Sequence, residues 1–194
     1  MNDPFLENGF GDESQLVLQL KNGDPEAINQ VVDRYGKPLF AFILRMVEDY
    51  QAAEDIFQET WVRVIRNIGS FRGESRFSTW LFQIALNLSR NMMRQMSRRS
   101  FVALDEAAEL SEDPDVDADK VILAQKIKKL VASLPVKMRE VIVLRYYHDK
   151  TDFEIAEITG LPQGTVKSRL HRATQMLRGK IEGTELAVPG AEVE

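Results

Sequence analysis

Residues 71–99 read FRGESRFSTWLFQIALNLSRNMMRQMSRR and carry the pattern around which the rest of the chain is arranged. From Phe77 onward, apolar residues recur three and four positions apart, which predicts one face of an α-helix. The polar side chains Gln83, Asn87, Arg90 and Arg94 fall on the opposite side of that helix. A short loop precedes it, and Ser75 in this loop is placed to cap the helix. The sequence therefore predicts an amphipathic helix with a basic outer face.

The net charge of −5 conceals an uneven distribution along the chain. Residues 1–60 carry 12 acidic and 4 basic side chains, whereas residues 61–100 carry eight Arg and one Glu. Residues 101–120 hold eight acids and one Lys, and residues 163–180 hold five basic side chains and no acid. Two basic segments separated by an acidic one favour a protein that is steered onto a polyanion. A core helix with a solvated basic face is the alternative interpretation of residues 71–99.

Composition excludes several classes of protein. A chain of 194 residues with 44% hydrophobic residues is long enough for one or two small domains with real cores. The absence of Cys excludes disulfides, thiol catalysis and Cys-ligated zinc. No apolar run approaches the roughly 20 residues that span a bilayer, and the acidic N-terminus does not resemble a signal peptide, so we expect a cytoplasmic protein without membrane insertion. His148 and His171 have no partners at catalytic or metal-binding spacing, so no catalytic residue, metal or cofactor is predicted.

Helical spacing recurs along most of the chain, and no convincing alternating strand pattern is found, which predicts an all-α protein. We expect one small helical domain over residues 13–97 and a second over residues 120–179. A flexible acidic linker over residues 98–119 would join them, and residues 1–12 and 180–194 would be disordered tails. Gly36, Lys37 and Pro38 are expected to separate two helices, and Asp24 and Asp49 to cap the helices that follow them.

A long helix is expected over residues 50–67, and its polar side chains gather on one face. Asp55, Gln58, Glu59 and Arg63 occur at positions i, i+3, i+4 and i+8 of this helix. The first interpretation is a solvated charged surface, which is the usual state of such residues. The second is a docking face for a basic partner helix, and the residues alone leave both open.

The spacing of residues 152–178 is typical of a helix-turn-helix. Ala156 would let two helices approach closely, Gly160 four residues later would form the turn, and Val166 would anchor the second helix. Asp152 is expected to cap the first of these helices. The outer face of the second helix is polar, as in a recognition helix that contacts base edges and phosphates; it comprises Thr165, Lys167, Ser168, Arg169, His171 and Arg172. A plain helical hairpin with a basic surface is the alternative.

Three motifs occur in one order: AEDIFQETWVRV at 53–64, SFRGESRFSTWLFQIALNLSRN at 70–91, and LPVKMREVIVLRYYHDKTDFEIAEITGLPQGTVKSRLHRA at 134–173. Together they closely resemble the small sigma factors of bacterial RNA polymerase, the extracytoplasmic-function (ECF) group. The resemblance covers roughly residues 13–178. It implies two all-helical domains, the second and fourth regions of the family, joined by a linker that passes through the polymerase's active cleft and RNA exit path.

The resemblance also implies roles for individual residues. The helix that carries Asp55, Gln58 and Glu59 would dock on the clamp of the β′ subunit of core RNA polymerase. The element that opens the minus-ten region and holds a flipped base would comprise Phe71, Arg72, Arg76, Phe77, Trp80, Asn87 and Arg90. The minus-thirty-five element would be contacted by Thr165, Lys167, Ser168, Arg169, His171 and Arg172. Many family members carry an aromatic residue where His171 stands, which leaves the local base preference open.

These expectations describe a promoter-specificity subunit without catalysis of its own. Its partners would be core RNA polymerase, promoter DNA and an anti-sigma factor. Parting DNA costs on the order of 1.4 kcal/mol per base step, and stacking one extruded base returns roughly 1–3 kcal/mol. The free energy gained by trapping one base therefore offsets the cost of about one broken base step. The rest must come from contacts with the polymerase, so we expect DNA melting only within the holoenzyme. Two alternative functions remain open. One is a DNA-binding regulator that acts without polymerase, and the other is a helical interaction protein with no DNA role.

Overall fold

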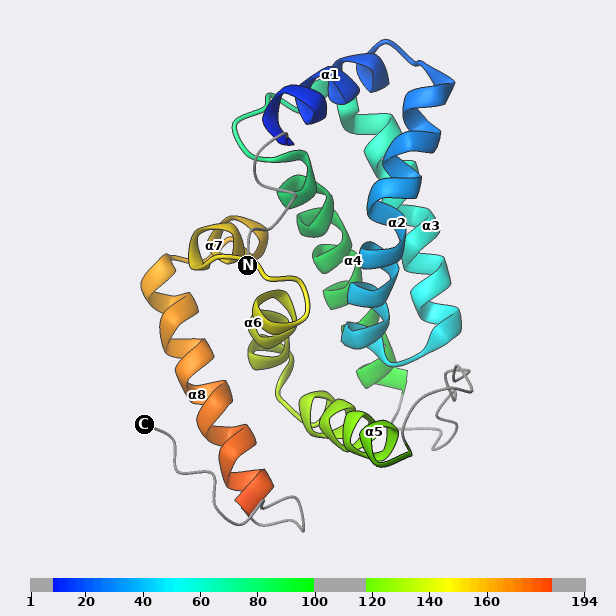
Figure 1. Ribbon diagram of the computed structural model, residues 1–194. Coiled ribbons are helices and arrows are strands. Elements are labelled where there is room, and N and C mark those ends of the chain that lie inside the picture. The colour runs from blue at the N-terminus through cyan, green and yellow to red at the C-terminus, as the bar shows by residue number, and fades with distance from the viewer. Residues whose placement is uncertain (1–8, 100–117, 183–194) are drawn as a thin grey trace.

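The computed structural model describes residues 9–99 and 118–182, and every regular element in these ranges is a helix. Figure 1 shows an N-terminal unit in which α2, α3 and α4 run alongside one another while α1 crosses one end. The C-terminal unit contains α5 to α8. The elements are α1 Gly9–Lys21, α2 Pro25–Val47, α3 Tyr50–Asn67, the 3₁₀ turn η1 Ile68–Ser70, α4 Phe77–Arg99, α5 Ala118–Ala132, α6 Val136–Tyr146, α7 Asp152–Thr159 and α8 Gln163–Glu182.

The predicted domain limits differ from the described helices at both ends. Helix α1 begins at Gly9 and α8 continues to Glu182, so helix extends into both segments that were expected to be disordered tails. The remainder of those two segments, and most of the expected linker 98–119, lie outside the described residues.

Helix α2 is continuous from Pro25 to Val47, so the expected break at Gly36, Lys37 and Pro38 is wrong. A proline inside a helix removes one backbone hydrogen bond and costs about 3 kcal/mol. Packing offsets that cost, because Leu39, Phe42, Ile43 and Met46 are fully buried along one face. Gly36 is also buried, and a Cβ atom there would meet the ring of Phe57 at 3.7 Å. Tertiary packing therefore outweighs two local helix breakers.

The helix ends of the N-terminal unit are fixed by side-chain caps. Asp24 accepts a hydrogen bond from the backbone N–H of Glu26, and Asp49 accepts one from that of Ala52, as predicted. The first turn of α4 is capped differently from the expectation. The Oε1 atom of Glu13, on α1, accepts the Ser78 N–H at 3.3 Å, whereas the hydroxyl of Ser75 donates to the carbonyl oxygen of Arg76. A residue of the first helix thus fixes the start of α4.

Helices α7 and α8 form the helix-turn-helix that the sequence predicts. Gly160 adopts the left-handed conformation, with φ of +71°, and closes α7. Val166 is fully buried, as the spacing requires. The cap of α7 is Thr151 rather than Asp152, because Thr151 and Glu154 form a reciprocal capping box. The turn thus orients α8 against α6 and α7.

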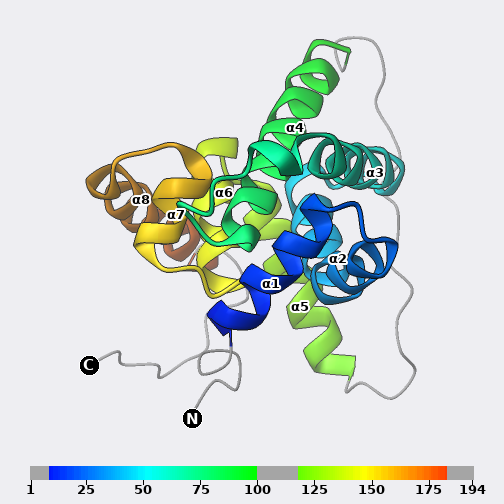
Figure 2. The same ribbon diagram turned by 90° about the horizontal axis from the view of Figure 1, so that it is seen from above.

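The two units pack directly against each other. Figures 1 and 2 both show α6 and α7 lying between α8 and the α2–α4 bundle. Helix α7 contacts α4, and α6 contacts α2. Buried residues of both units form one continuous hydrophobic cluster that includes Phe42, Leu86, Leu144 and Ile155. The described part of the chain is therefore one packed body.

Candidate nucleic-acid and protein interfaces

The loop between η1 and α4 is held by two buried aromatic rings. Phe71 and Phe77 are 8% and 1% exposed, and both pack near the ring of Trp80. The Phe71 and Trp80 ring centroids are 5.1 Å apart. The Nζ atom of Lys21 donates a hydrogen bond to the Phe71 carbonyl oxygen at 2.6 Å. In this structure Phe71 and Phe77 therefore anchor the loop, and their rings are not free to stack on a base.

The residues between these anchors face solvent. Arg72 and Glu74 lie 3.9 Å apart with side chains about four-fifths exposed, so their ion pair adds little stability. Gly73 has φ of +73°, a conformation that glycine adopts without strain. Arg76 is exposed at the end of the loop. The result is a short basic loop that projects from a rigid aromatic base.

Helix α4 presents its two predicted DNA contacts differently. Asn87 is exposed, while Arg90 is partly covered by the C-terminal unit. The Nε atom of Arg90 donates to Oε2 of Glu140 at 3.0 Å, and its terminal nitrogens lie 3.4–3.5 Å from the carbonyl oxygen of Thr159. Trp80 is partly buried within the aromatic cluster described above.

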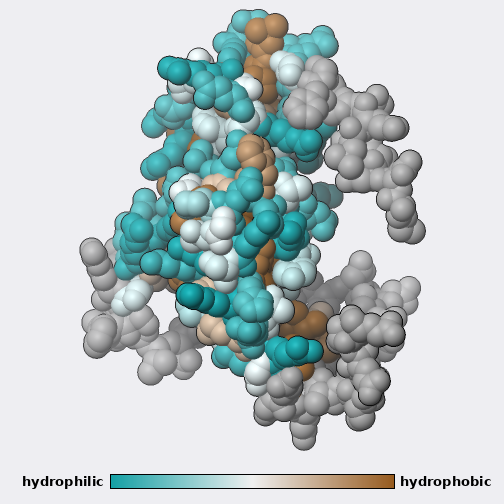
Figure 3. Space-filling model, turned by 90° about the vertical axis from the view of Figure 1, so that its left-hand side faces the viewer, coloured by the Kyte–Doolittle hydropathy of each residue, from teal (hydrophilic) through white to brown (hydrophobic). Residues whose placement is uncertain are grey.

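The recognition-helix candidate α8 divides its predicted contacts between two faces. Thr165 is partly exposed, and the four exposed residues are Lys167, Ser168, His171 and Arg172. Arg169 points inward instead, because its guanidinium lies 2.9 Å from the buried carboxylate of Glu140. The side chain of Arg169 is 18% exposed. Figure 3 views the side of the molecule that carries α7 and α8, where a mainly hydrophilic surface is crossed by a narrow hydrophobic strip.

Glu140, on α6, joins both predicted DNA-binding regions. Its side chain is 1% exposed and accepts hydrogen bonds from Arg90 of α4 and Arg169 of α8. Burial raises the pKa of the Glu140 carboxyl, and the guanidinium groups of Arg90 and Arg169 oppose that rise. Glu140 was not predicted as a site residue from the sequence. The sequence does contain a sign of its burial. Glu140 precedes Val143 by three positions and Leu144 by four, so helical spacing places this acid on the apolar face of α6.

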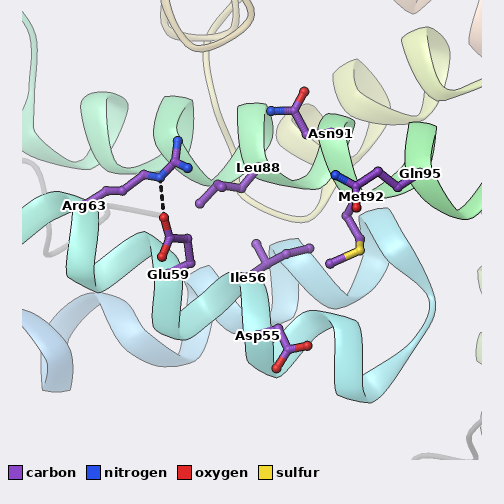
Figure 4. Close-up of a pocket in the computed structure, with 8 residues that line it drawn as sticks. All are labelled: Asp55, Ile56, Glu59, Arg63, Leu88, Asn91, Met92 and Gln95. Atoms are coloured by element: carbon purple, nitrogen blue, oxygen red, sulfur yellow. Dashed lines mark hydrogen bonds and ion pairs between the residues drawn. The ribbon is translucent and has the colours of Figure 1, made fainter.

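The predicted protein-binding face lies beside a groove between α3 and α4. Asp55 and Gln58 are exposed, and Glu59 is partly exposed and ion-paired with Arg63 at 2.8 Å. Figure 4 shows Leu88 and Met92 reaching from α4 toward α3. The groove has a volume of about 280 Å³ and is lined by Asp55, Ile56, Glu59, Arg63, Leu88, Asn91, Met92 and Gln95. An apolar floor with an acidic and amide rim suits a helix that carries both apolar and basic side chains.

His148 lies between the two units. Its ring meets Phe42 and Phe82 edge-on, with centroids 5.6 Å and 5.2 Å away. Burial, with the nearby cations of Arg45 and Lys150, lowers the pKa of His148 to about 4. The side chain is therefore neutral at pH 7. In this structure the ring packs against aromatic side chains of both α2 and α4.

The described residues hold neither a metal-binding cluster nor a membrane-spanning helix. Within residues 9–99 and 118–182, no group of three or more His, Asp or Glu side chains is placed to hold a metal ion. Among the helices in those ranges, none combines the length and apolar composition that crossing a membrane requires.

Family models match both units of the chain. The sigma-70 region 2 model matches residues 31–99, and the sigma-70 region 4 model matches residues 124–177. The ECF RNA polymerase sigma factor SigW of Bacillus subtilis is 34% identical over 176 residues, which cover 85% of this chain and 94% of the relative. The ECF RNA polymerase sigma-E factor of Haemophilus influenzae is 34% identical over 182 residues, covering 88% and 95%.

Two solved structures share the fold. CnrH, solved with the cytosolic domain of CnrY, matches 89% of this chain and 99% of its own with a TM-score of 0.70 and 24% identity. The sigma factor RpoE of Bartonella quintana, solved with the anti-sigma factor NepR, matches 79% and 96% with a TM-score of 0.68 and 27% identity. The chain therefore belongs to the ECF sigma factors, alternative sigma factors that direct RNA polymerase in transcription initiation.

Proposed function

We propose that this sigma factor recognises its promoters through two separate elements, one in each unit. The exposed loop 72–76, with Asn87 on α4, contacts the minus-ten element. The outer face of α8, with Lys167, Ser168, His171 and Arg172, contacts the minus-thirty-five element in the major groove. The observation that carries the proposal is this face: four polar residues are exposed while Val166 and Ala173 are buried beneath them.

The aromatic residues of the minus-ten element act as anchors in this proposal. Phe71 and Phe77 fix both ends of the loop, so that a flipped base enters the space above Gly73 and between Arg72 and Arg76. Buried anchors support such a role because a preorganised loop loses less entropy when it captures a base. The ring of Trp80 packs against both Phe71 and Phe77 and holds them in place. Arg90 binds the phosphate backbone once Glu140 releases it.

Arg169 has a positioning role rather than a base contact in this proposal. Its ion pair with Glu140 fixes α8 against α6, and this sets the angle at which the exposed residues of α8 enter the groove. Arg172 is the candidate for a bidentate guanine contact, because it is exposed on the outer face one turn of helix beyond Ser168.

Core RNA polymerase binds the groove between α3 and α4. Asp55 and Glu59 supply an acidic rim, and Ile56 and Leu88 belong to the apolar lining. Gln58 is exposed on the same helix beside the groove. The chain performs no catalysis itself; it places the polymerase's chemistry at the promoter, in the cytoplasm where the enzyme works. An anti-sigma factor is a further partner, supported by the relative RpoE, which was solved with the anti-sigma factor NepR.

A run-off transcription assay tests the proposal. Core polymerase is mixed with this chain and a random promoter library, and we expect transcripts that share two preferred elements. A mobility-shift titration then compares the chain alone with the chain plus core enzyme. Tight and specific binding of duplex DNA by the chain alone would favour a regulator that acts without polymerase. Transcription that is unchanged in the Arg172→Ala variant would remove the assignment of α8.

A further inference from the structure

We propose that α1 positions the loop 72–76 from both ends, and that Lys21 and Glu13 are the positioning residues. Lys21 holds the residue after which the loop begins, and Glu13 holds the first turn of α4, where the loop ends. These two α1 contacts fix the path of the loop before any base arrives. The inference rests on the proposed function in one respect, the contact of this loop with the minus-ten element.

The start of the loop is held by Lys21, the last residue of α1. Its Nζ atom donates a partly buried hydrogen bond to the Phe71 carbonyl oxygen at 2.6 Å, and it lies 6.0 Å from the centroid of the Phe71 ring. Phe71 leaves the 3₁₀ turn η1 in an extended conformation, with φ of −69° and ψ of 115°. Because helical hydrogen bonding ends at this residue, its carbonyl oxygen needs a partner from elsewhere, and a charged donor makes one of the stronger hydrogen bonds.

The end of the loop is held by Glu13, about two turns earlier on α1. Its Oε1 atom accepts hydrogen bonds from the backbone N–H of Ser78 at 3.3 Å and from the hydroxyl of Tyr35 at 3.0 Å. The first N–H groups of a helix have no partner within that helix, and α4 begins at Phe77, so Glu13 supplies one of the missing partners. The ring centroids of Tyr35 and Phe77 are 5.5 Å apart. Through Tyr35 the same carboxylate therefore also supports the aromatic anchor at this end of the loop.

Both contacts come from one helix, and packing holds that helix in place. Leu16, Val17 and Leu20, which lie between the two positioning residues, are at most 8% exposed. Glu13 and Lys21 are eight residues apart, which is about 12 Å along a helix and brings both side chains to roughly the same side. Figure 1 shows α1 crossing the end of the bundle at which α4 begins. A rigid element of fixed length therefore connects the two ends of the loop.

The middle of the loop lacks comparable support. The side chains of Arg72 and Glu74 are about four-fifths exposed, and a Cβ atom at Gly73 would meet nothing within 4 Å outside the adjacent residues. The path of the loop is therefore set mainly at its ends. A loop held in this way loses less entropy when it captures a base than a loop that must first be ordered. Removing one α1 contact should weaken base capture about two- to tenfold, the factor that one hydrogen bond contributes.

Hydrogen exchange of the free chain, followed by mass spectrometry, tests the α1 contacts without polymerase or DNA. Lys21→Met keeps most of the length of the side chain but removes the donor, and it should speed exchange across residues 68–73 about two- to tenfold. Lys21→Arg retains a charged donor and should restore slow exchange. Lys37→Met is the matched control, because Lys37 is exposed on α2 and the charge change is identical. Glu13→Ala should speed exchange across residues 77–80 instead.

Transcription assays measure whether the α1 contacts matter for opening DNA. The template is a promoter selected from the random library, used either as a duplex or with its minus-ten region already unpaired by mismatches. For Lys21→Met we expect about two- to tenfold less transcript from the duplex, normal transcript from the unpaired template and unchanged affinity for core polymerase. The two templates differ because the unpaired one does not require base capture to offset the cost of parting the strands. A chain that is merely destabilised would lose activity on both templates and affinity for core polymerase together.

The proposal is overturned if Lys21→Met and Lys37→Met exchange at the same rate around the loop, or if Lys21→Arg fails to restore slow exchange. It is also overturned if Lys21→Met transcribes the duplex as well as the unchanged chain does, or loses both templates equally. Circular dichroism checks that each variant remains helical. Faster exchange in a chain that directs no transcription would reject the proposed function, and with it the role of the loop toward DNA, while confirming that α1 holds the loop.

Discussion

Glu13 on α1 accepts a hydrogen bond from the Ser78 backbone N–H at 3.3 Å, so a side chain 65 residues away caps α4, the helix that carries Asn87 and Arg90 of the proposed minus-ten element. The same Oε1 atom accepts the hydroxyl of Tyr35 at 3.0 Å. One carboxylate therefore ties together α1, α2 and α4. It also places a negative charge at the positive end of the α4 dipole.

We expect Glu13→Ala to lower the free energy of unfolding by about 0.5–2 kcal/mol, the usual cost of losing a helix cap. Urea unfolding followed by circular dichroism measures this change. Gln15→Ala, an exposed neighbour on the same helix, is the control and should change stability by less than about 0.5 kcal/mol. Equal stability of the two variants would show that the contact between α1 and α4 does not contribute.

Arg169 and Arg172 should give opposite results although they are three residues apart. Arg169 is ion-paired inside the C-terminal unit, so Arg169→Ala should lower the free energy of unfolding by about 1–3 kcal/mol. Arg172 is exposed, so Arg172→Ala should leave stability within about 0.5 kcal/mol while reducing transcription from a matched promoter. Thermal unfolding and run-off transcription measure the two effects. A stable Arg169→Ala chain would argue against its positioning role.

The sequence predicted the helices, the helix-turn-helix and the two basic segments, because apolar periodicity and glycine spacing are local signals. It did not predict that α2 continues through Pro38, because the burial of Leu39 and Phe42 that offsets the cost is a tertiary effect. The cap that Glu13 provides could not be predicted from local sequence rules either, because Glu13 lies on α1 and the backbone N–H that it accepts lies on α4.

The candidate site shows a similar division. The exposed Lys167, Ser168 and Arg172 were predicted from helical spacing alone. Arg169 was expected on the same outer face, since residues 168, 169 and 172 are close on a helix. Only the buried acid Glu140 on another helix explains why Arg169 turns inward. Contacts of charged side chains between helices could therefore not be predicted, because their partners are far apart in the sequence.

His148 makes the stability of the chain depend on pH. Its pKa falls from 6.5 to about 4 on folding, so the unfolded chain binds more protons than the folded chain between these values. The stabilising effect is complete above about pH 6.5 and is lost as the pH falls toward 4. By linkage the loss is on the order of 2 kcal/mol at pH 5.

Urea titrations at pH 5 and pH 7.5 measure this loss. His148→Phe keeps a ring between Phe42 and Phe82 but cannot be protonated, so its stability should change less over the same interval. The exposed His171 supplies the control, and His171→Gln should retain the full pH dependence. An unchanged pH dependence in His148→Phe would show that another group titrates.

The groove between α3 and α4 leads to a prediction about polymerase binding. Asp55 is exposed at its rim. Substitutions of exposed side chains usually leave a fold intact. Asp55→Lys should therefore lower affinity for core polymerase at least about tenfold, by repelling a basic partner surface, while leaving the helical content unchanged. Asp33→Lys carries the same charge change on an exposed face of α2 and should bind core enzyme normally. Fluorescence anisotropy with labelled chain measures both affinities. If Asp55→Lys and Asp33→Lys bound equally well, the docking surface would have to lie elsewhere, because only the first variant changes the rim of the groove.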